Sequence, residues 1–300
     1  MQQPLISVVI PTHNRAELLP AAIGSLLNQS YANWEAVVVD DGSTDNTQTV
    51  VAAISDSRIR YHYQENRQLN GARNTGVSLA NGQFLGFLDD DDHFLPDHLE
   101  LLVKAMMGDQ YRFGIYRSGE VLQGNTNRSL GYNYRNVQDI LPQYWAYPTG
   151  MFGMLLATDL ARQYPFDEAH LLLDDFLWLN AVLRDHQLWQ IDAHTAVVRL
   201  HPKQRSATYL TEELLQKNLD RLLQAYNLPG IPQRVPFDLY RKQALHQYFH
   251  FSRQLVREGR PQRALKVWKR GLSYADIGDW KDAGKTFAKI ILRGGRNIGK

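Results

Sequence analysis

The nonapeptide FLGFLDDDD, residues 84–92, places four consecutive aspartates directly after five largely apolar residues. The apolar part is typical of a buried strand, and the pattern over 96–107, which begins with Pro96, indicates a helix after the turn. Carboxylates this dense repel one another, so ordering them costs stability unless a cation lies among them. Hard oxygen ligands suit Mg²⁺ or Mn²⁺, which proteins usually bind through one or two carboxylates and substrate phosphates. The alternative is a solvated acidic turn beside a helix N-terminus.

Strands and helices alternate along the first hundred residues. We expect strands at 5–10, 34–40, 58–63 and 84–88, separated by helices at 15–29, 47–54 and 71–80. Continuous apolar strands in this arrangement are typical of a parallel sheet covered on both faces. We therefore expect an α/β fold with a mostly parallel, Rossmann-like sheet flanked by helices. Later in the chain we expect a strand pair over 189–200 and an all-helical C-terminal extension from 211 onward.

Acidic residues recur where ligands bind to such sheets. Asp40 and Asp41 end the second strand, 89–92 follow the fourth, and Asp174 and Asp175 begin a later helix. Ligands of open α/β sheets bind beyond the carboxyl ends of the strands. A cation held there would neutralise charge on a departing diphosphate, and a separate carboxylate would take a proton from an incoming hydroxyl.

The composition is that of an ordinary globular protein. The 300 residues are 44% hydrophobic and 21% charged, and they include no cysteine, so disulfides and Cys-based zinc sites are excluded. The N-terminus lacks the charged and apolar regions of a signal peptide, and no apolar run is long enough to cross a bilayer. We expect a cytoplasmic location and no nucleic-acid partner.

Charge is distributed unevenly along the chain. Residues 231–300 hold 16 Lys or Arg against 5 Asp or Glu, a net charge of +11, whereas 1–230 hold 17 against 26, a net charge of −9. The segment 280–300 has apolar residues at helical spacing among basic ones, which predicts peripheral attachment to the anionic inner face of a membrane. The alternative is that its apolar side chains pack on the preceding helices.

Four motifs occur together in a fixed order. They read VVIPTHNR (8–15), VVVDDGSTD (37–45), GARNTG (71–76) and GQFLGFLDDDD (82–92). The set resembles family 2 of the inverting nucleotide-sugar glycosyltransferases, which have the GT-A fold, and the resemblance covers about 4–205. It implies a catalytic domain at 1–228, with a nucleotide-binding half at about 1–110 and an acceptor half at about 111–228. The remaining 229–300 would form a basic helical region.

The resemblance implies a set of nucleotide-binding residues. Pro11, Thr12 and His13 would line the nucleobase pocket, with His13 packing on the base. Asp41 would accept a hydrogen bond from a base N–H, and a carboxylate suits the imide of uracil. Arg73 would approach Asp41 and the nucleotide.

The same resemblance implies a metal site. Asp89 and Asp91 match the family's Asp-x-Asp motif, which contacts the ribose and binds the divalent metal, Mn²⁺ or Mg²⁺. Asp90 fills the variable position and, with Arg15, completes the predicted nucleotide contacts. His201 lies in RLHP (199–202), which is similar to a late family motif that holds the diphosphate or the metal.

A catalytic base is implied at Asp174 and Asp175, where the family has a Glu-Asp pair whose Asp is the general base. The first acid is Asp here, and Asn180 replaces the Arg common later in that helix, so the two remain alternatives, with Asp175 favoured. The pair also suits a helix N-cap.

The predicted activity is metal-dependent, inverting transfer of a sugar from a nucleotide-sugar donor, UDP-linked by preference. The acceptor would be a saccharide or a lipid-linked hydroxyl in polysaccharide or glycolipid biosynthesis. A degenerate, non-catalytic GT-A module for docking or assembly is one alternative. A sugar-1-phosphate nucleotidyltransferase is another, but it requires a Gly-rich loop where this chain has PTHNR (11–15).

Overall fold

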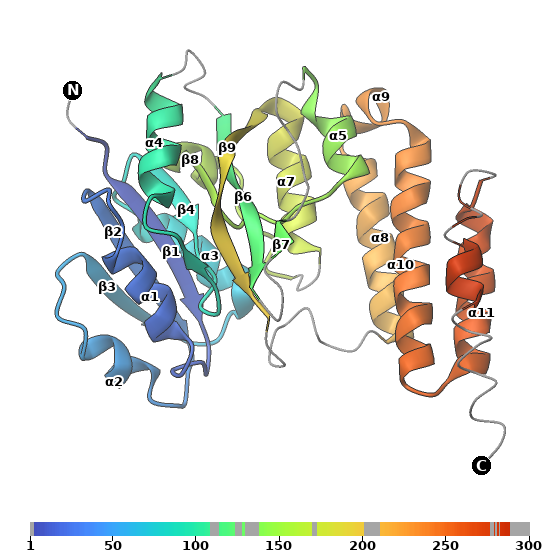
Figure 1. The fold of residues 1–300 in the computed structure, drawn as a ribbon, viewed down its shortest axis with the longest axis horizontal. Coiled ribbons are helices and arrows are strands. Elements are labelled where there is room, and N and C mark those ends of the chain that lie inside the picture. Colours follow the sequence, from blue (N-terminus) through green and yellow to red (C-terminus); the bar gives the residue numbers. More distant parts are fainter. Residues whose placement is uncertain are drawn as a thin grey trace. The chain divides into compact units, whose positions relative to one another are not determined.

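The computed structural model describes residues 3–108, 114–123, 128–129, 138–169, 173–200, 211–276, 279, 281 and 283–288. The chain forms two compact units (Figure 1). The first contains Met1–Ile140 and Thr149–Gln204, and the second contains Leu141–Pro148 and Arg205–Lys300. Among the described residues, no helix has both the length and the apolar composition that crossing a membrane requires.

The first four strands form the parallel part of the sheet, as the sequence predicts. They are β1 (Ile6–Thr12), β2 (Trp34–Asp41), β3 (Ile59–Gln64) and β4 (Phe84–Phe87), in the order β3-β2-β1-β4. Every residue of β1 and β2 is buried, because helices cover both faces of the sheet.

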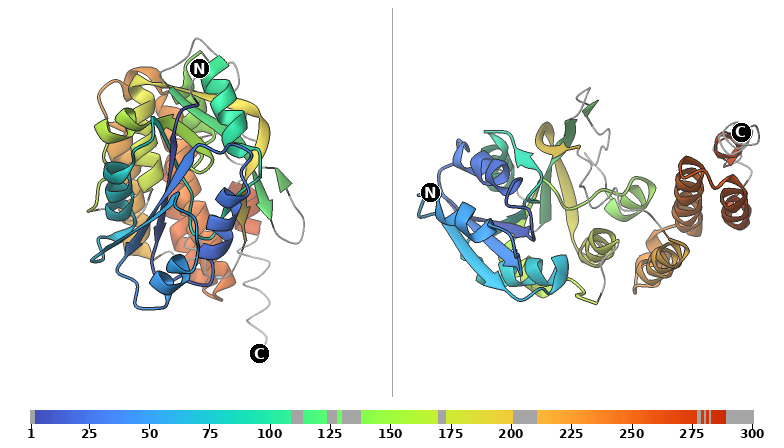
Figure 2. Two further views of the ribbon diagram at one scale, coloured as in Figure 1. Left: turned by 90° about the vertical axis from the view of Figure 1, so that its left-hand side faces the viewer. Right: turned by 90° about the horizontal axis from the view of Figure 1, so that it is seen from below.

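Helices α1 and α3 lie on opposite faces of this parallel part (Figure 2). Alternate side chains of β2 show why: Val38 packs in the core cluster that contains α1, whereas Val37 packs with Ala72 of α3. Helix α3 approaches β1 so closely that a Cβ on Gly76 would lie 2.2 Å from Val9 Cγ1. The helices in this part are α1 (Leu19–Leu27), α2 (Thr47–Ala52), α3 (Gln68–Leu79) and α4 (His98–Gly108).

The remaining strands make the sheet mixed. The sheet continues from β4 through β8 (Met154–Ala157), β6 (Gly114–Gln123), β9 (Gln187–Arg199) and β5 (His93–Phe94), and β7 (Arg128–Ser129) pairs with β6. In this part only β6 and β9 run parallel, and the other described pairs are antiparallel. The expected parallel pairing is therefore confirmed for the first four strands, and the later strands make the sheet mixed. Helices α6 (Thr158–Gln163) and α7 (Asp174–Asp185) also belong to this unit.

The predicted strand pair over 189–200 is wrong, because β9 is one continuous strand. Its register against β6 shifts twice, between Gln190 and His194 and between His194 and Ala196, and at both places β9 carries extra residues. Asp192 lies in this irregular stretch and interrupts the apolar alternation, so the sequence resembles a turn although the chain does not reverse. A bulge absorbs the extra residues without ending the strand.

The described part of the second unit is helical. Its helices are α5 (Ile140–Ala146), α8 (Glu212–Tyr226), α9 (Ile231–Arg234), α10 (Phe237–Arg257), α11 (Pro261–Gly271) and a short 3-10 helix (Leu272–Tyr274). Leu219 of α8, Phe249 of α10 and Val267 of α11 share one core cluster. Because α8 packs in this core, the packing boundary lies at 205. The functional boundary that we place at 228 stays a prediction.

The segment that begins near 280 packs at least in part on this core. Ala283 is fully buried in the core, and the ring of Phe287 lies 5.0 Å from that of Trp268. These contacts match the packing alternative for the predicted membrane helix. Trp280 and 289–300 lie outside the described residues.

Candidate active site

The four aspartates form a tight turn after β4. The Asp92 N–H donates to the Asp89 carbonyl oxygen at 3.1 Å, which folds the run back on itself. Carboxylate oxygens of Asp89, Asp91 and Asp92 thereby lie within 4.8 Å of one another. Three hard oxygen donors this close fit the coordination chemistry of Mg²⁺ or Mn²⁺. Of the predicted metal ligands, Asp89 and Asp91 belong to this triad, and His201 lies outside the described residues.

The carboxylate of Asp90 contacts the end of β1 and the loop that follows it. One carboxylate oxygen accepts from Thr12 Oγ1 and the other from Arg15, both at 2.8 Å. Arg15 also donates to Asp91 Oδ2 at 2.8 Å. Burial raises the pKa of Asp90 to about 6, although Arg15 and Thr12 oppose the shift. Two predicted nucleotide-binding residues, Thr12 and Arg15, therefore hold the acidic turn in place.

Asp92 is the member of the triad that the sequence interpretation missed. Burial and the nearby charges of Asp89 and Asp91 raise its pKa to about 8, despite a hydrogen bond of 2.9 Å from the Arg199 N–H. The Arg199 side chain also donates to the Asp91 carbonyl oxygen, so the end of β9 is tied to the turn. The signal was present in the sequence as the fourth aspartate, but an Asp-x-Asp motif does not require it.

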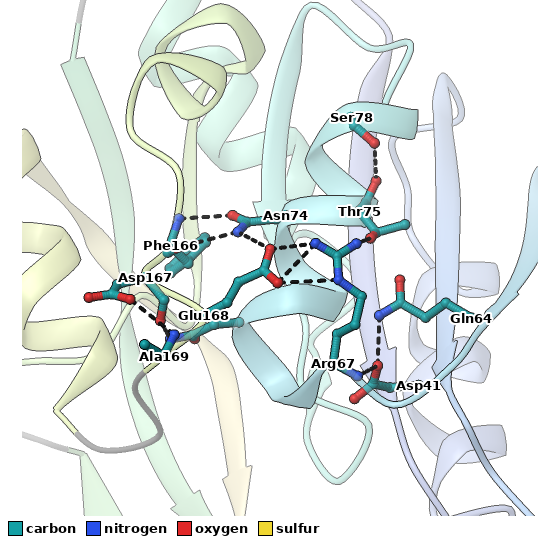
Figure 3. Close-up of polar contacts among 11 residues, drawn as sticks. Asp41, Gln64, Arg67, Asn74, Thr75, Ser78, Phe166, Asp167, Glu168 and Ala169 are labelled. Atoms are coloured by element: carbon teal, nitrogen blue, oxygen red, sulfur yellow. Dashed lines mark hydrogen bonds and ion pairs between the residues drawn. The ribbon is translucent and has the colours of Figure 1, made fainter.

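The residues predicted to bind the nucleobase lie where β1 and β2 end side by side. Thr12 is paired with Asp40 in the parallel register, and His13 Nδ1 donates to the Asp41 carbonyl oxygen at 2.8 Å. The buried Asp41 side chain accepts from Gln64 Nε2 at 2.6 Å and from the Arg67 N–H at 2.8 Å (Figure 3). Both of these hydrogen bonds are accepted by the same oxygen of Asp41, Oδ1. Pro11 is buried at the end of β1.

Arg73 lies elsewhere than the sequence analysis placed it. Instead of Asp41, it contacts Asp175 Oδ1 at 2.8 Å, Asp174 Oδ2 at 3.2 Å and Asp89 Oδ1 at 3.6 Å. Burial by itself would lower the pKa of this guanidinium, but the three carboxylates outweigh burial and raise the pKa above its usual value. A buried cation thus joins the acidic turn to the pair at the start of α7.

The pair at the start of α7 consists of one shielded and one accessible carboxylate. The side chain of Asp174 is 8% exposed and that of Asp175 is 32% exposed. Neither residue is the N-cap, because that position is taken by Leu173, which has a left-handed φ of 53° and no side-chain cap bond. The second oxygen of Asp175 lies 3.4 Å from the Met151 N–H. Capping of α7 therefore does not explain the pair, and of the two acids Asp175 is the more open to solvent.

Comparison with protein families places the chain. The model described as glycosyl transferase family 2 matches residues 7–161, which is more than half of the sequence. The chain belongs to this family. The predicted family is thereby confirmed, and the protein is a glycosyltransferase with the GT-A fold.

Two bacterial family 2 relatives show how far the likeness extends. The UDP-Glc:alpha-D-GlcNAc-diphosphoundecaprenol beta-1,3-glucosyltransferase WfgD of Escherichia coli is 33% identical over 200 residues, which cover 64% of this chain and 75% of the relative. The GalNAc(5)-diNAcBac-PP-undecaprenol beta-1,3-glucosyltransferase of Campylobacter jejuni is 34% identical over 186 residues, which cover 59% of each chain.

Solved structures support the fold over nearly the whole chain. TarS of S. aureus in complex with UDP-GlcNAc gives a TM-score of 0.67 at 19% identity, covering 96% of this chain and 89% of that one. The mannosyltransferase PcManGT from Pyrobaculum calidifontis, in complex with GDP-Man and Mn²⁺, gives 0.62 at 18% identity, covering 99% and 88%. At these identities the likeness establishes the architecture.

Proposed function

We propose that this family 2 enzyme transfers a sugar with inversion from a UDP-sugar to a hydroxyl of a lipid-linked or saccharide acceptor, in polysaccharide or glycolipid biosynthesis. The observation that carries the proposal is the Arg73 contact with Asp89 and with the pair at the start of α7. It brings a cation-binding turn and a separate acid pair to one buried guanidinium, which is the arrangement that transfer from a nucleotide diphosphate requires.

The donor base would be bound between His13 and Asp41. With Oδ1 of Asp41 already engaged by Gln64 and Arg67, Oδ2 is the oxygen that accepts an imide N–H. A hydrogen bond to a charged group contributes about 1.5–3 kcal/mol, enough to select uracil over bases that lack the matching donor.

The diphosphate would lie over the acidic turn. A divalent cation held by Asp89, Asp91 and Asp92 supplies positive charge against the negative charge that develops on the leaving diphosphate. Arg15 fixes Asp91 in place, and the Arg199 N–H fixes Asp92. His201 remains a proposed further ligand.

Asp175 is the proposed general base. It is the more exposed of the two acids. Arg73 orients its Oδ1, and its second oxygen, which accepts a long hydrogen bond of 3.4 Å from the Met151 N–H, would take the acceptor proton. Attack from the face opposite the diphosphate inverts the anomeric centre, so an α-linked donor gives a β-linked product. Asp174, shielded beside the same guanidinium, helps to hold Arg73.

A lipid-linked acceptor is favoured by the two relatives, whose names both include an undecaprenol diphosphate carrier. Such a substrate requires the enzyme to work at a membrane, and a basic surface on the second unit suits that. Along α11 the exposed positions include Arg263, Lys266, Lys269 and Arg270, and the apolar face is already buried in the core. We therefore propose peripheral attachment on the cytoplasmic face through charge, without insertion of this helix.

The alternatives are disfavoured by the same residues. A non-catalytic module would have no need for a carboxylate triad within 4.8 Å or for a buried arginine that joins it to a second acid pair. The loop after β1 contacts Asp90 and Asp91 through side chains, whereas a nucleotidyltransferase would use a glycine-rich loop there.

Nucleotide binding by calorimetry, together with a transfer assay over a panel of nucleotide sugars with Mn²⁺, tests the proposal. UDP should bind about 10- to 100-fold more tightly than ADP or CDP, and Asp41→Ala should remove that preference. Asp159→Asn, on the exposed side of α6, is the matched control. Equal affinity for the three nucleotides in the unmutated protein would exclude the uracil assignment, and no transfer from any donor would exclude the activity.

A further inference from the structure

Arg67, at the start of α3, is bonded through its side chain to a residue 101 positions later in the sequence. Its Nη2 lies 2.6 Å from Glu168 Oε1 and 2.9 Å from Oε2, and Nε lies 3.2 Å from Oε2 (Figure 3). A planar guanidinium that contacts both oxygens of one carboxylate fixes orientation as well as distance. The pair therefore defines where Glu168 lies relative to α3.

Two asparagines of α3 dock the same segment. Asn74 Nδ2 donates to the Phe166 carbonyl oxygen at 2.9 Å, and the Phe166 N–H donates back to Asn74 Oδ1 at 2.8 Å. Asn74 also donates to Glu168 Oε1 at 3.0 Å, and Asn70 donates to the Asp167 carbonyl oxygen at 2.8 Å. Residues 166–168 are thus held on α3 by three side chains.

The ion pair of Arg67 with Glu168 is linked to the proposed site through both of its residues. The Arg67 N–H donates to Asp41 Oδ1, and in the sequence five residues separate Glu168 from Asp174. At Gly71 a Cβ would lie 2.4 Å from Arg67 Cβ and 3.3 Å from Glu168 Oε2, so the close approach requires glycine. One residue, Arg67, therefore contacts both the base-reading carboxylate and the segment that leads to the acid pair.

Stability does not account for this pair. Both side chains are at least one-third exposed, and exposed ion pairs typically contribute about 0–1 kcal/mol to folding. We propose that Arg67 and Glu168 are positioning residues for sugar transfer, which set the start of α7 relative to the nucleotide pocket. This inference rests on the proposed function. It concerns how the proposed base at the start of α7 is aligned with the pocket for the nucleotide-sugar donor.

The test compares Arg67→Met, Glu168→Gln and the double variant in the full chain, with Asp159→Asn as the control for loss of an exposed ion pair. The turnover number kcat, expressed per UDP-binding site counted by calorimetry, should fall by about 10- to 100-fold in each single variant, because small misplacements carry such costs. The donor KM should stay within about twofold. Because the two residues act as one unit, the double variant should lose no more than either single variant.

A second measurement does not depend on transfer. In hydrogen exchange, UDP should slow exchange of the amides of 164–169 in the unmutated protein and not in Arg67→Met, although that variant still binds UDP. Unchanged kcat, losses that multiply in the double variant, or a rise in donor KM alone would overturn the inference. Failure of the proposed function would instead be seen as no transfer by the unmutated protein, and the exchange result would still decide the coupling.

Discussion

The two compact units use charge in opposite ways. In the first unit, Asp90, Asp92 and Arg73 are buried, and each is bonded to specific partners. In the second, Lys266 and Lys269 are exposed on α11, with no acidic partner among the described residues. Burying a charge is costly unless it is paired, whereas an exposed charge costs little. Buried charge is therefore the stronger indicator of a site, and the exposed charges of α11 would need a partner outside the chain to have a role.

Within the first unit the two acid clusters also differ. Arg73 offsets part of the negative charge of the pair at the start of α7, whereas in the turn at 89–92 burial and the crowding of carboxylates raise the pKa of Asp92. The first cluster has a buried cation of this chain as its partner, and the second is where we propose that an added cation binds. The four predictions below test these differences, beginning with the largest effect.

Asp175→Asn should reduce transfer by about 10²–10⁴-fold, because a general base is removed. Asp174→Asn should have a smaller effect, since that side chain is shielded and only supports Arg73. Donor binding measured by calorimetry should be unchanged in both variants. If Asp174→Asn slows transfer more than Asp175→Asn does, the accessible acid is not the base.

Asp91→Asn should make transfer nearly independent of added divalent ion and reduce it by about 10- to 100-fold at saturating Mn²⁺, because a charged ligand is replaced by a neutral one. A titration of activity with Mn²⁺ and Mg²⁺ measures both effects. Asp159→Asn should leave the titration unchanged. An unaltered Mn²⁺ dependence in Asp91→Asn would remove this residue from the metal site.

Asp92 should make stability fall as the pH rises in the presence of EDTA. Its pKa is about 8 in the fold and about 3.9 in an unfolded chain, so at pH 6 the folded protein holds a proton that the unfolded chain has released. The corresponding stability is full below about pH 4 and falls steadily until the pH passes through about 8, and on the order of 2 kcal/mol of it is lost between pH 6 and pH 8.

Urea unfolding at pH 6 and pH 8 measures this loss, and Asp92→Asn should reduce it. Mn²⁺ at pH 8 should restore stability to the unmutated protein more than to the variant. If stability depends on pH in the same way in both proteins, the pKa of Asp92 is not raised by burial and by its acidic neighbours.

Lys269→Gln should weaken binding to vesicles that contain anionic lipid by about fivefold, since one basic residue near such a surface contributes about 1 kcal/mol. Lys104→Gln, an exposed lysine of α4 in the first unit, is the control. Co-sedimentation at low salt gives the measurement. Equal binding by the unmutated protein to neutral and anionic vesicles would leave the basic surface of α11 without this role.

The sequence was most informative where a local pattern of residues indicates a single kind of structure. The apolar runs before Asp41 and Asp89 predicted strands of a parallel sheet, and the motifs at the strand ends predicted the family. Local patterns could not place Arg73, because its three partners come from two distant segments that only the fold brings together. Asp92 was missed for a related reason: the backbone N–H that it accepts from belongs to Arg199, more than a hundred residues away.

The later strands were harder to predict than the earlier ones. Alternation is a weak guide in β9, where extra residues shift the register against β6 and a polar residue in the shift looks like a turn. The Arg67 contact with Glu168 was not predicted at all, because neither residue stands out in the sequence from other exposed charges.

The second unit is assembled from two separated pieces of chain, and this affects how the protein is made. Trp145 of α5 is fully buried, with its ring 5.7 Å from that of Tyr226 and its carbonyl oxygen bonded to Gln243. A ribosome adds about 5–20 residues per second, so roughly 5–20 s pass between synthesis of Trp145 and of Gln243, 98 residues later. During that interval the indole lacks the partners that cover it in the second unit, so this stage of synthesis exposes an apolar surface that a chaperone could protect.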